Sequence, residues 1–257
     1  MRYLKIILLH FENIFEHRLR SLIWFFTSMV NPLIILIFWA GIPVSNRQNI
    51  NSYYLLLIVA SALLASHIEE DIADYDIRQG DLVRYLIKPF PYYWIKFIEE
   101  IPYRVLQGFY GIIALIIINI LFKNIIEIHP GWLTVGIGII AAALAFFMSF
   151  TYKMCLGMLA FWFKQIRGIT QLMEIISIIF AGYIIPIDMF PAQLKTIAYF
   201  LPFSYMIYFP VKIFQGEVAA SDLSKIIIGQ LVWLTIFIII NRFEWKRGIK
   251  IFTAIGQ

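Results

Sequence analysis

The chain has 257 residues, of which 61% are hydrophobic and only 14% are charged, and its formal net charge is +5 at pH 7. A soluble globular domain carries about 45–50% apolar residues, so this composition argues against that class. The single cysteine, Cys155, excludes an intrachain disulfide. The whole chain, residues 1–257, is expected to form one membrane domain.

Long apolar runs fill most of the sequence. A helix needs about 17–25 apolar residues to cross a bilayer, and all but the second run reach that length once their flanks are counted. The runs are too long and too uniform for the alternating strands of a membrane barrel. They predict an all-α polytopic membrane protein with six transmembrane helices, over residues 22–40, 53–66, 105–121, 132–163, 169–187 and 226–240.

Residues 3–19 precede the first run and place apolar side chains at helical spacing against charged ones. This pattern predicts a helix that lies in the inner interface of the membrane, with a plain cytoplasmic extension as the alternative. The fourth run, 132–163, would be about 48 Å long as one helix. We therefore expect it to tilt strongly or to bend near Lys153.

Lysine and arginine are unevenly distributed between the two sides of the predicted bundle. The side that holds both termini carries 15 of the 21 basic residues, and the other side carries five. The positive-inside rule therefore predicts that both termini lie in the cytoplasm. The expected location of this multi-pass protein is the bacterial plasma membrane. The same bias accounts for the net positive charge, so nucleic acid is not an expected partner.

The predicted cytoplasmic loop, residues 67–104, begins with the acidic segment 69–76, which contains Glu69, Glu70, Asp71, Asp74 and Asp76. Clustered carboxylates can hold Mg²⁺, so one hypothesis is a membrane-embedded transferase that uses this cluster. The sequence has no second acidic cluster to complete such a site. A solvated acidic extension of the second helix is the simpler interpretation.

Farther along this loop, residues 81–88 form a short amphipathic segment between Gly80 and Pro89. Its predicted helix places Leu82, Tyr85 and Leu86 on one face. A small amphipathic helix beneath a membrane bundle needs a partner to dock against, and nothing else in this chain is free to be that partner.

Two charged residues, Lys153 and Glu174, fall inside the fourth and fifth runs. Isolated charges in a bilayer are costly, so we expect the two side chains to form an ion pair between neighbouring helices. The pair would either stabilise the bundle or face a substrate path, and the sequence does not distinguish these roles.

The segment 188–222, between the last two runs, is too apolar for an exposed loop and is interrupted by prolines. It predicts two short helices that dip into the outer leaflet and return, a re-entrant hairpin. The residues that mark this hairpin are Pro186, Pro191, Pro202, Phe203 and Pro210.

Catalytic motifs are missing from the sequence. It has no Gly-x-x-x-x-Gly-Lys-Ser/Thr P-loop, no Gly-x-Ser-x-Gly and no His-Glu-x-x-His. We therefore expect neither an enzyme, nor a metal site, nor a cofactor bound by this chain itself.

Three segments, in their order along the chain, resemble the ABC type-2 exporter permease family. They are residues 80–89, residues 182–191 with 201–216, and the tail 245–256. The resemblance implies the permease of an ATP-driven exporter and a coupling helix that contacts an ATPase. A lining rich in Phe, Tyr and Met would suit an amphipathic substrate. The coupling residues would be Gly80, Asp81, Leu82, Val83, Arg84, Tyr85, Leu86, Lys88 and Pro89.

The resemblance also implies the partners. A second permease, either an identical copy or a paralogue, would pair with this chain in the bilayer. Two separate ABC ATPase subunits would bind ATP and Mg²⁺. A non-transporting membrane assembly subunit remains an alternative, and the sequence does not identify the substrate.

Overall fold

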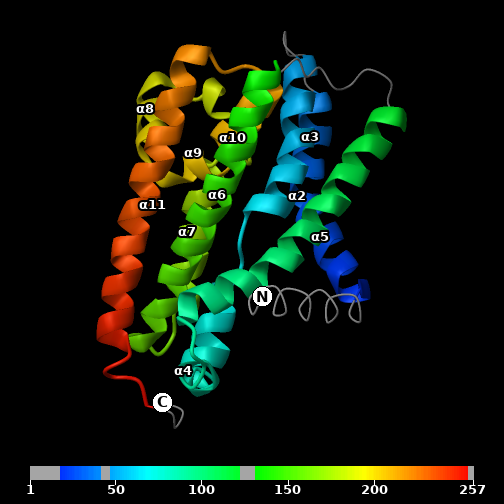
Figure 1. Ribbon diagram of the computed structural model, residues 1–257. Coiled ribbons are helices and arrows are strands. Elements are labelled where there is room, and N and C mark those ends of the chain that lie inside the picture. Colours follow the sequence, from blue (N-terminus) through cyan, green and yellow to red (C-terminus); the bar gives the residue numbers. More distant parts are fainter. Residues whose placement is uncertain (1–17, 42–46, 122–130, 254–257) are drawn as a thin grey trace.

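The computed structural model describes residues 18–41, 47–121 and 131–253, and all regular elements in these ranges are helical. Figure 1 shows a bundle of long helices with α4 at one end and the short helices α8–α10 toward the other. The α-helices are α2 (Arg18–Ala40), α3 (Arg47–Leu64), α4 (Val83–Leu86), α5 (Tyr92–Leu121), α6 (Trp132–Met158), α7 (Arg167–Phe180), α8 (Ala192–Phe200), α9 (Pro202–Met206), α10 (Tyr208–Gln215) and α11 (Ala220–Gly248). A π-helix, η1 (Asp71–Arg78), and two 3₁₀-helices, η2 (Leu159–Phe161) and η3 (Ile187–Met189), complete the order.

Within the described residues, α5, α6 and α11 are long and apolar enough to cross a membrane. Shorter apolar stretches lie in α2 (Phe25–Trp39) and in α3 (Asn49–Leu64). The protein is therefore an all-α polytopic membrane protein, as its composition predicts. Six helices (α2, α3, α5, α6, α7 and α11) coincide with the six apolar runs, and the number that fully cross the bilayer stays a prediction.

The helix in the fifth run, α7, is shorter than predicted, because it ends at Phe180 instead of continuing to residue 187. Its 14 residues span about 21 Å, less than the bilayer core of about 30 Å. The helix stops at Gly182, which has φ +81°, a conformation that favours glycine. The amide of Tyr183 donates to the Ile178 carbonyl and that of Gly182 to the Ile179 carbonyl, the hydrogen-bond pattern of a Schellman cap.

Within the predicted cytoplasmic loop 67–104, α5 already begins at Tyr92. Pro102 lies inside α5, where it cannot donate a backbone hydrogen bond. Figure 1 shows α5 bending between its first turns and its longer second part, as expected for a helix with an internal proline. The first part of α5 therefore runs in a different direction from the second part and brings side chains close to α4.

Helix α6 lies at the centre of the bundle and packs against α11, α10 and α3. No break in the helix accompanies the predicted bend near Lys153, since α6 continues to Met158 and is followed by the 3₁₀-turn η2. The small residues Ala141 and Ala145 are fully buried within this chain. The side-chain amide of Gln230 from α11 donates to the Ala141 carbonyl at 2.9 Å. Small side chains allow this close approach of two membrane helices.

The segment predicted as a two-helix hairpin, 188–222, contains three short helices, α8, α9 and α10, before α11 begins at Ala220. Leu201, with an extended backbone, separates α8 from α9, and Ile207 separates α9 from α10. Prolines explain two of the starts, since Pro191 directly precedes α8 and Pro202 is the first residue of α9. The predicted interfacial helix, 3–19, lies almost entirely outside the described residues.

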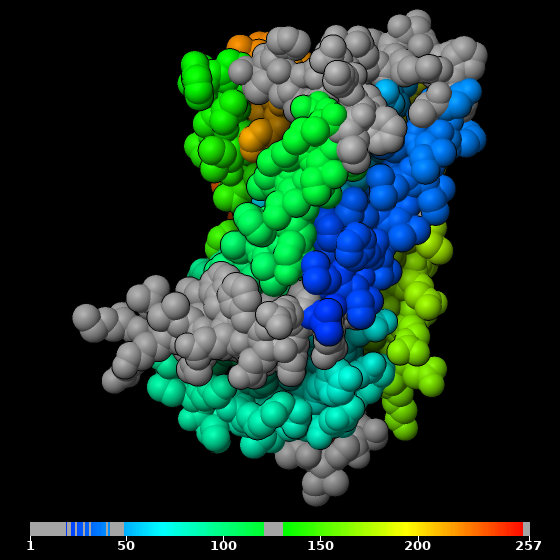
Figure 2. All heavy atoms as spheres, turned by 90° about the vertical axis from the view of Figure 1, so that its right-hand side faces the viewer, coloured from blue at the N-terminus to red at the C-terminus, as the bar shows by residue number. Residues whose placement is uncertain are grey.

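Figure 2 shows the face of the molecule on which α2 and α5 lie next to each other. Large apolar side chains on these two helices are exposed, which suits lipid tails or another membrane protein and not water. They include Ile23, Phe26, Ile34, Ile37, Phe109, Ile112, Ile116 and Ile120.

Candidate functional site

Helix α4 lies at the same end of the molecule as the end of α11, and we call this the α4 end (Figure 1). The chain reaches α4 through Gly80, whose φ of 84° reverses the backbone after η1. The amide of Leu82 then donates to the carbonyl of Asp76 at 2.8 Å, which ties the start of α4 to η1. Because α4 spans only Val83–Leu86, it is shorter than the predicted helix over 81–88.

The faces of this short helix differ from the prediction. Leu82 is fully buried and packs into a core with Ile72 and Phe97, so its assignment to an exposed docking face with Leu86 is wrong. The exposed apolar side chains are Val83, Leu86 and Ile87, with exposures of 39%, 45% and 80%. Sequence periodicity could not show this, because it does not reveal which side of an amphipathic segment meets the bundle.

The remaining predicted coupling residues surround this apolar group. Asp81 and Arg84 form an exposed ion pair on the surface of the segment. The ammonium of Lys88 lies 4.9 Å from the centre of the Tyr85 ring, and Pro89 is exposed. Charged side chains therefore border the exposed apolar residues of α4.

Between α4 and the bundle, a polar cluster that the sequence did not reveal connects three elements. The carboxylate of Asp76 accepts a hydrogen bond from the Tyr92 hydroxyl at 2.6 Å and lies 2.6 Å from the Lys96 ammonium. Lys96 also lies 4.7 Å from the centre of the Tyr85 ring. Burial raises the pKa of Tyr85, so its hydroxyl stays neutral here. We call Asp76, Tyr85, Tyr92 and Lys96 the anchor cluster.

The anchor cluster extends to the last helix. The ring of Tyr92 stacks on Trp245 of α11, with centroids 5.1 Å apart and an interplanar angle of 12°. Tyr85 meets the edge of the same Tyr92 ring at 5.3 Å. A displacement of α4 would therefore press on η1 and α5 and, through the Tyr92 ring, on the end of α11.

The acidic segment 69–76 does not gather around one point. Asp74 pairs with Arg78, Asp76 with Lys96, and Glu69 with Lys153. Glu70 lies 3.9 Å from Arg167, and both side chains are exposed. Within the part of the chain that the structure describes, no group of three or more acids, histidines or cysteines is placed to hold a metal ion. These separate pairings offer no support for a magnesium-dependent transferase.

Lys153 and Glu174 lie together between α6 and α7, with the ammonium nitrogen 2.7 Å from the carboxylate of Glu174. Sequence reasoning missed a third member, Glu69, whose carboxylate lies 2.6 Å from the same nitrogen. One turn later, Gly157 lets η1 approach α6, since an added Cβ would lie 2.8 Å from Ile72 and 2.9 Å from the Glu69 carbonyl. The glycine thus makes room for the triad Glu69–Lys153–Glu174, in which Lys153 and Glu69 are buried and Glu174 is partly exposed.

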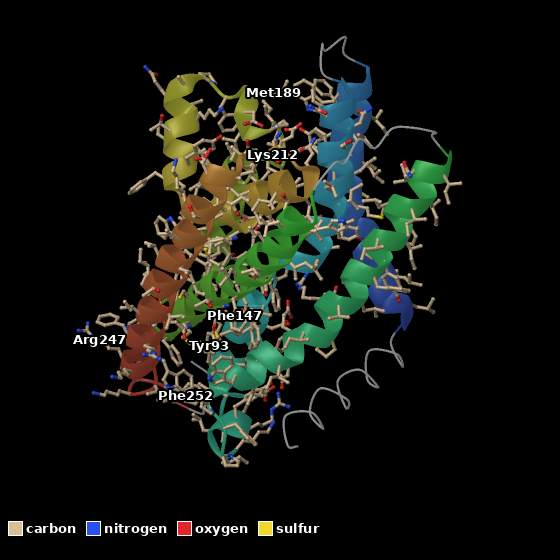
Figure 3. The ribbon with its side chains drawn as sticks, turned by 45° about the horizontal axis from the view of Figure 1, so that its top comes forward. Tyr93, Phe147, Met189, Lys212, Arg247 and Phe252 are labelled. Carbon is tan, nitrogen blue, oxygen red and sulfur yellow. The ribbon has the colours of Figure 1, made fainter. Side chains whose placement is uncertain are left out.

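The predicted hairpin residues lie at the other end of the molecule. Figure 3 shows Lys212 and Met189 there, far from Arg247 and Phe252 at the α4 end. Pro186, Pro202, Phe203 and Pro210 are buried, whereas Pro191 is exposed. The buried ammonium of Lys212 lies 2.7 Å from Asp188 and also pairs with Glu217, which joins η3 to α10 and the following loop.

A comparison of the sequence with models of protein families identifies the family of this chain. The family model for ABC-2 family transporter proteins matches residues 22–256. The chain belongs to the ABC-2 transporter family. Among curated proteins, a search finds no match to this chain.

Because it belongs to this family and has apolar helices of membrane length, the ABC-2 permease is a multi-pass membrane component of a transporter. Permeases of this family are typically non-catalytic subunits that associate with ABC ATPase partners. The α4 end, with its exposed apolar side chains and the anchor cluster behind them, is therefore the candidate functional site of the ABC-2 permease.

Proposed function

We propose that this ABC-2 permease is the transmembrane subunit of an ATP-driven exporter and that α4 is its contact with the ATPase. The observation that carries the proposal is the exposed apolar group Val83, Leu86 and Ile87 on a short helix that protrudes at the α4 end. Apolar side chains exposed to water favour association with another protein, because binding removes their surface from water.

The surroundings of this group resemble a small protein interface. Arg84 and Lys88 border the apolar side chains, and interfaces commonly have a polar rim around an apolar centre. Buried Leu82 and the anchor cluster behind α4 support the helix from inside the bundle. A rigid support is what a helix needs in order to pass a movement of its partner to the membrane.

In the proposed exporter, both termini face the cytoplasm of a bacterial cell and two permeases enclose the substrate path. The second permease is a copy of this chain or a paralogue. Two ATPase subunits bind ATP and Mg²⁺ and close beneath the membrane. Each closure pushes an α4 helix, and the anchor cluster carries the push to η1, α5 and α11, which moves an amphipathic substrate outward.

The double substitution Leu86→Asp and Ile87→Asp tests this contact. We expect at least about a tenfold loss of co-purified ATPase, because two apolar contacts are removed and two charges are introduced. The matched control is Leu133→Asp, an equally exposed apolar position at the start of α6, which should retain the ATPase. Full retention of the ATPase by the folded double variant would overturn the proposal.

ATP hydrolysis by the reconstituted complex of permease and ATPase distinguishes a transporting role from a non-transporting assembly role. ATP hydrolysis that rises in the presence of amphipathic candidate substrates supports export. A rate of ATP hydrolysis that stays unchanged with a broad panel of such substrates, while the subunits remain bound to each other, favours the assembly role.

A further inference from the structure

A cavity of about 400 Å³ lies at the end of the molecule opposite α4, among η3, α8, α9, α10 and the start of α11. Its volume falls in the range of small-molecule sites, about 300–1,000 Å³. Aromatic side chains form much of its wall, and Lys212, labelled in Figure 3, belongs to its lining. The aromatic residues are Tyr199, Tyr205, Tyr208 and Phe209.

The four rings form one continuous aromatic wall centred on Phe209. Its ring centroid lies 5.2 Å from that of Tyr199, 4.9 Å from that of Tyr205 and 5.3 Å from that of Tyr208. The face of an aromatic ring is electron-rich and attracts a cation within about 6 Å. Several rings side by side are a common way to hold an ammonium group that is too bulky for a tight ion pair.

The charges that line the cavity leave an excess of negative charge. The lining holds three carboxylates, of Asp188, Glu217 and Asp222, and two ammonium groups, of Lys212 and Lys225. Lys212 is shared by Asp188 and Glu217, and Lys195, at the edge of the site, supplies a second positive charge near Asp188. Once Lys195 turns away from Asp188, the carboxylates of the lining outnumber its ammonium groups, and the cavity is then better suited to a cation than to an anion.

Asp188 remains ionised in this setting. Burial acts to raise its pKa, but hydrogen bonds from Lys212 and Tyr208 and the charges of Lys212 and Lys195 outweigh burial and hold the pKa below its usual value. Asp222 pairs with Lys225 at 2.7 Å, and the two side chains are 49% and 75% exposed. Exposed pairs of this kind contribute little, about 0–1 kcal/mol, so Asp222 can exchange its partner for another cation.

The protein itself already places an ammonium group against the aromatic wall. The Lys195 nitrogen lies 5.7 Å from the centre of the Tyr199 ring. It is 3.7 Å from the nearest Asp188 oxygen, which is too long for a hydrogen bond. Its side chain is 36% exposed at the edge of the site, so an external ammonium group could take its place.

We propose that this cavity binds an organic ammonium group, either a protonated or a quaternary amine. A free amphipathic amine and the head group of a zwitterionic lipid share this chemistry. The inference goes beyond the proposed function, because binding needs neither an ATPase nor transport. It is therefore tested on the purified permease alone, and its failure leaves the α4 contact untouched.

The experiment compares choline with 3,3-dimethylbutan-1-ol, a neutral molecule of nearly the same shape, by saturation-transfer NMR on the permease in phosphatidylglycerol nanodiscs. Choline should bind and the neutral alcohol should not. Tyr199→Leu and Asp222→Asn should each weaken choline binding about fivefold, the loss expected for one ring or one exposed charge. Lys195→Gln should strengthen it, because the competing internal ammonium is removed.

Tyr75→Leu is the matched control for Tyr199→Leu, since Tyr75 is an exposed tyrosine in η1 at the α4 end. Its choline affinity should equal that of the unaltered protein. Because Asp222 is exposed, Asp222→Asn keeps the test valid even if Tyr199→Leu does not fold. Equal binding of choline and the alcohol, or a choline affinity unchanged in both Asp222→Asn and Lys195→Gln, would overturn the proposal.

Nanodiscs of phosphatidylcholine distinguish the two sources of the ammonium group. Weaker choline binding there than in phosphatidylglycerol supports the proposal with the lipid head group as the occupant. Equal binding in both lipids supports it with a free amine as the occupant.

Discussion

Lys153 lies in α6 with 8% of its side chain exposed, and two carboxylates approach its single ammonium group. Burying the charges of Lys153 and Glu69 is costly, and the attraction within the triad offsets this cost only while all partners remain in place. Glu69 comes from the segment after α3 and Glu174 from α7, so the triad joins three parts of the chain around α6. At the scale of residues, its ion pairs connect α6 to the segment after α3 and to α7.

Removing the central cation should therefore destabilise the bundle. We expect Lys153→Met to lower the free energy of unfolding by about 3–5 kcal/mol, because Glu69 is left buried next to Glu174 without a counter-charge. Thermal unfolding of the purified protein measures the effect. Lys225→Met is the control, because Lys225 also pairs with a carboxylate but is 75% exposed, and its loss should cost less than about 1 kcal/mol.

The double variant Lys153→Met with Glu69→Gln removes the uncompensated buried charge as well. It should recover part of the lost stability. A Lys153→Met protein as stable as the Lys225→Met control would show that the triad contributes nothing to the fold.

The elements at the end opposite α4 depend on the early stop of α7. Beyond Gly182 the chain turns toward η3 and the short helices, and two tyrosines of α3 hold it there. The Tyr53 hydroxyl donates to the Gly182 carbonyl at 2.9 Å, and the Tyr54 hydroxyl donates to the Ile184 carbonyl at 2.7 Å. These bonds satisfy carbonyl groups that the short helix leaves without helical partners.

Gly182→Ala should weaken this junction. Its φ of +81° costs a residue with a side chain about 1–2 kcal/mol, and an added Cβ would lie only 2.5 Å from the Tyr53 hydroxyl. We expect a loss of at least about 2 kcal/mol in thermal unfolding measurements. Gly136→Ala, in α6, should be neutral or stabilising, because an added Cβ there would meet no atom within 4 Å. Equal stability of the two variants would contradict this account.

At the scale of the whole molecule, the two ends of the bundle have different chemistry. One end presents α4 and the anchor cluster, and the other presents the aromatic cavity. The distribution of lysine and arginine predicts that the α4 end faces the cytoplasm. This orientation is required for α4 to meet a cytoplasmic ATPase.

Cysteine labelling tests the orientation, and the chain is convenient for it because its single cysteine, Cys155, is buried. In a Cys155→Ser background, Trp132→Cys and Ile87→Cys place thiols at highly exposed positions at opposite ends. With the permease expressed alone, an impermeant maleimide should label Trp132→Cys in intact cells and Ile87→Cys only after permeabilisation. Labelling of Ile87→Cys in intact cells would reverse the orientation and exclude the α4 contact.

Much of this protein follows from its sequence alone. Apolar runs of membrane length determine an all-helical polytopic protein, because a backbone in lipid has to satisfy its hydrogen bonds within each segment. The positions of the six runs and the pairing of Lys153 with Glu174 depend on hydrophobicity and on the cost of an isolated charge, both of which can be read locally.

The rest was decided by tertiary packing. The buried position of Leu82, the bonds from Asp76 to Tyr92 and Lys96, and the end of α7 at Gly182 each depend on a partner from another part of the bundle. The same holds for Glu69 beside Lys153 and for the aromatic cavity, whose lining comes from several helices. Periodicity shows that a segment has two faces, but only the packed bundle determines which face is covered and by what.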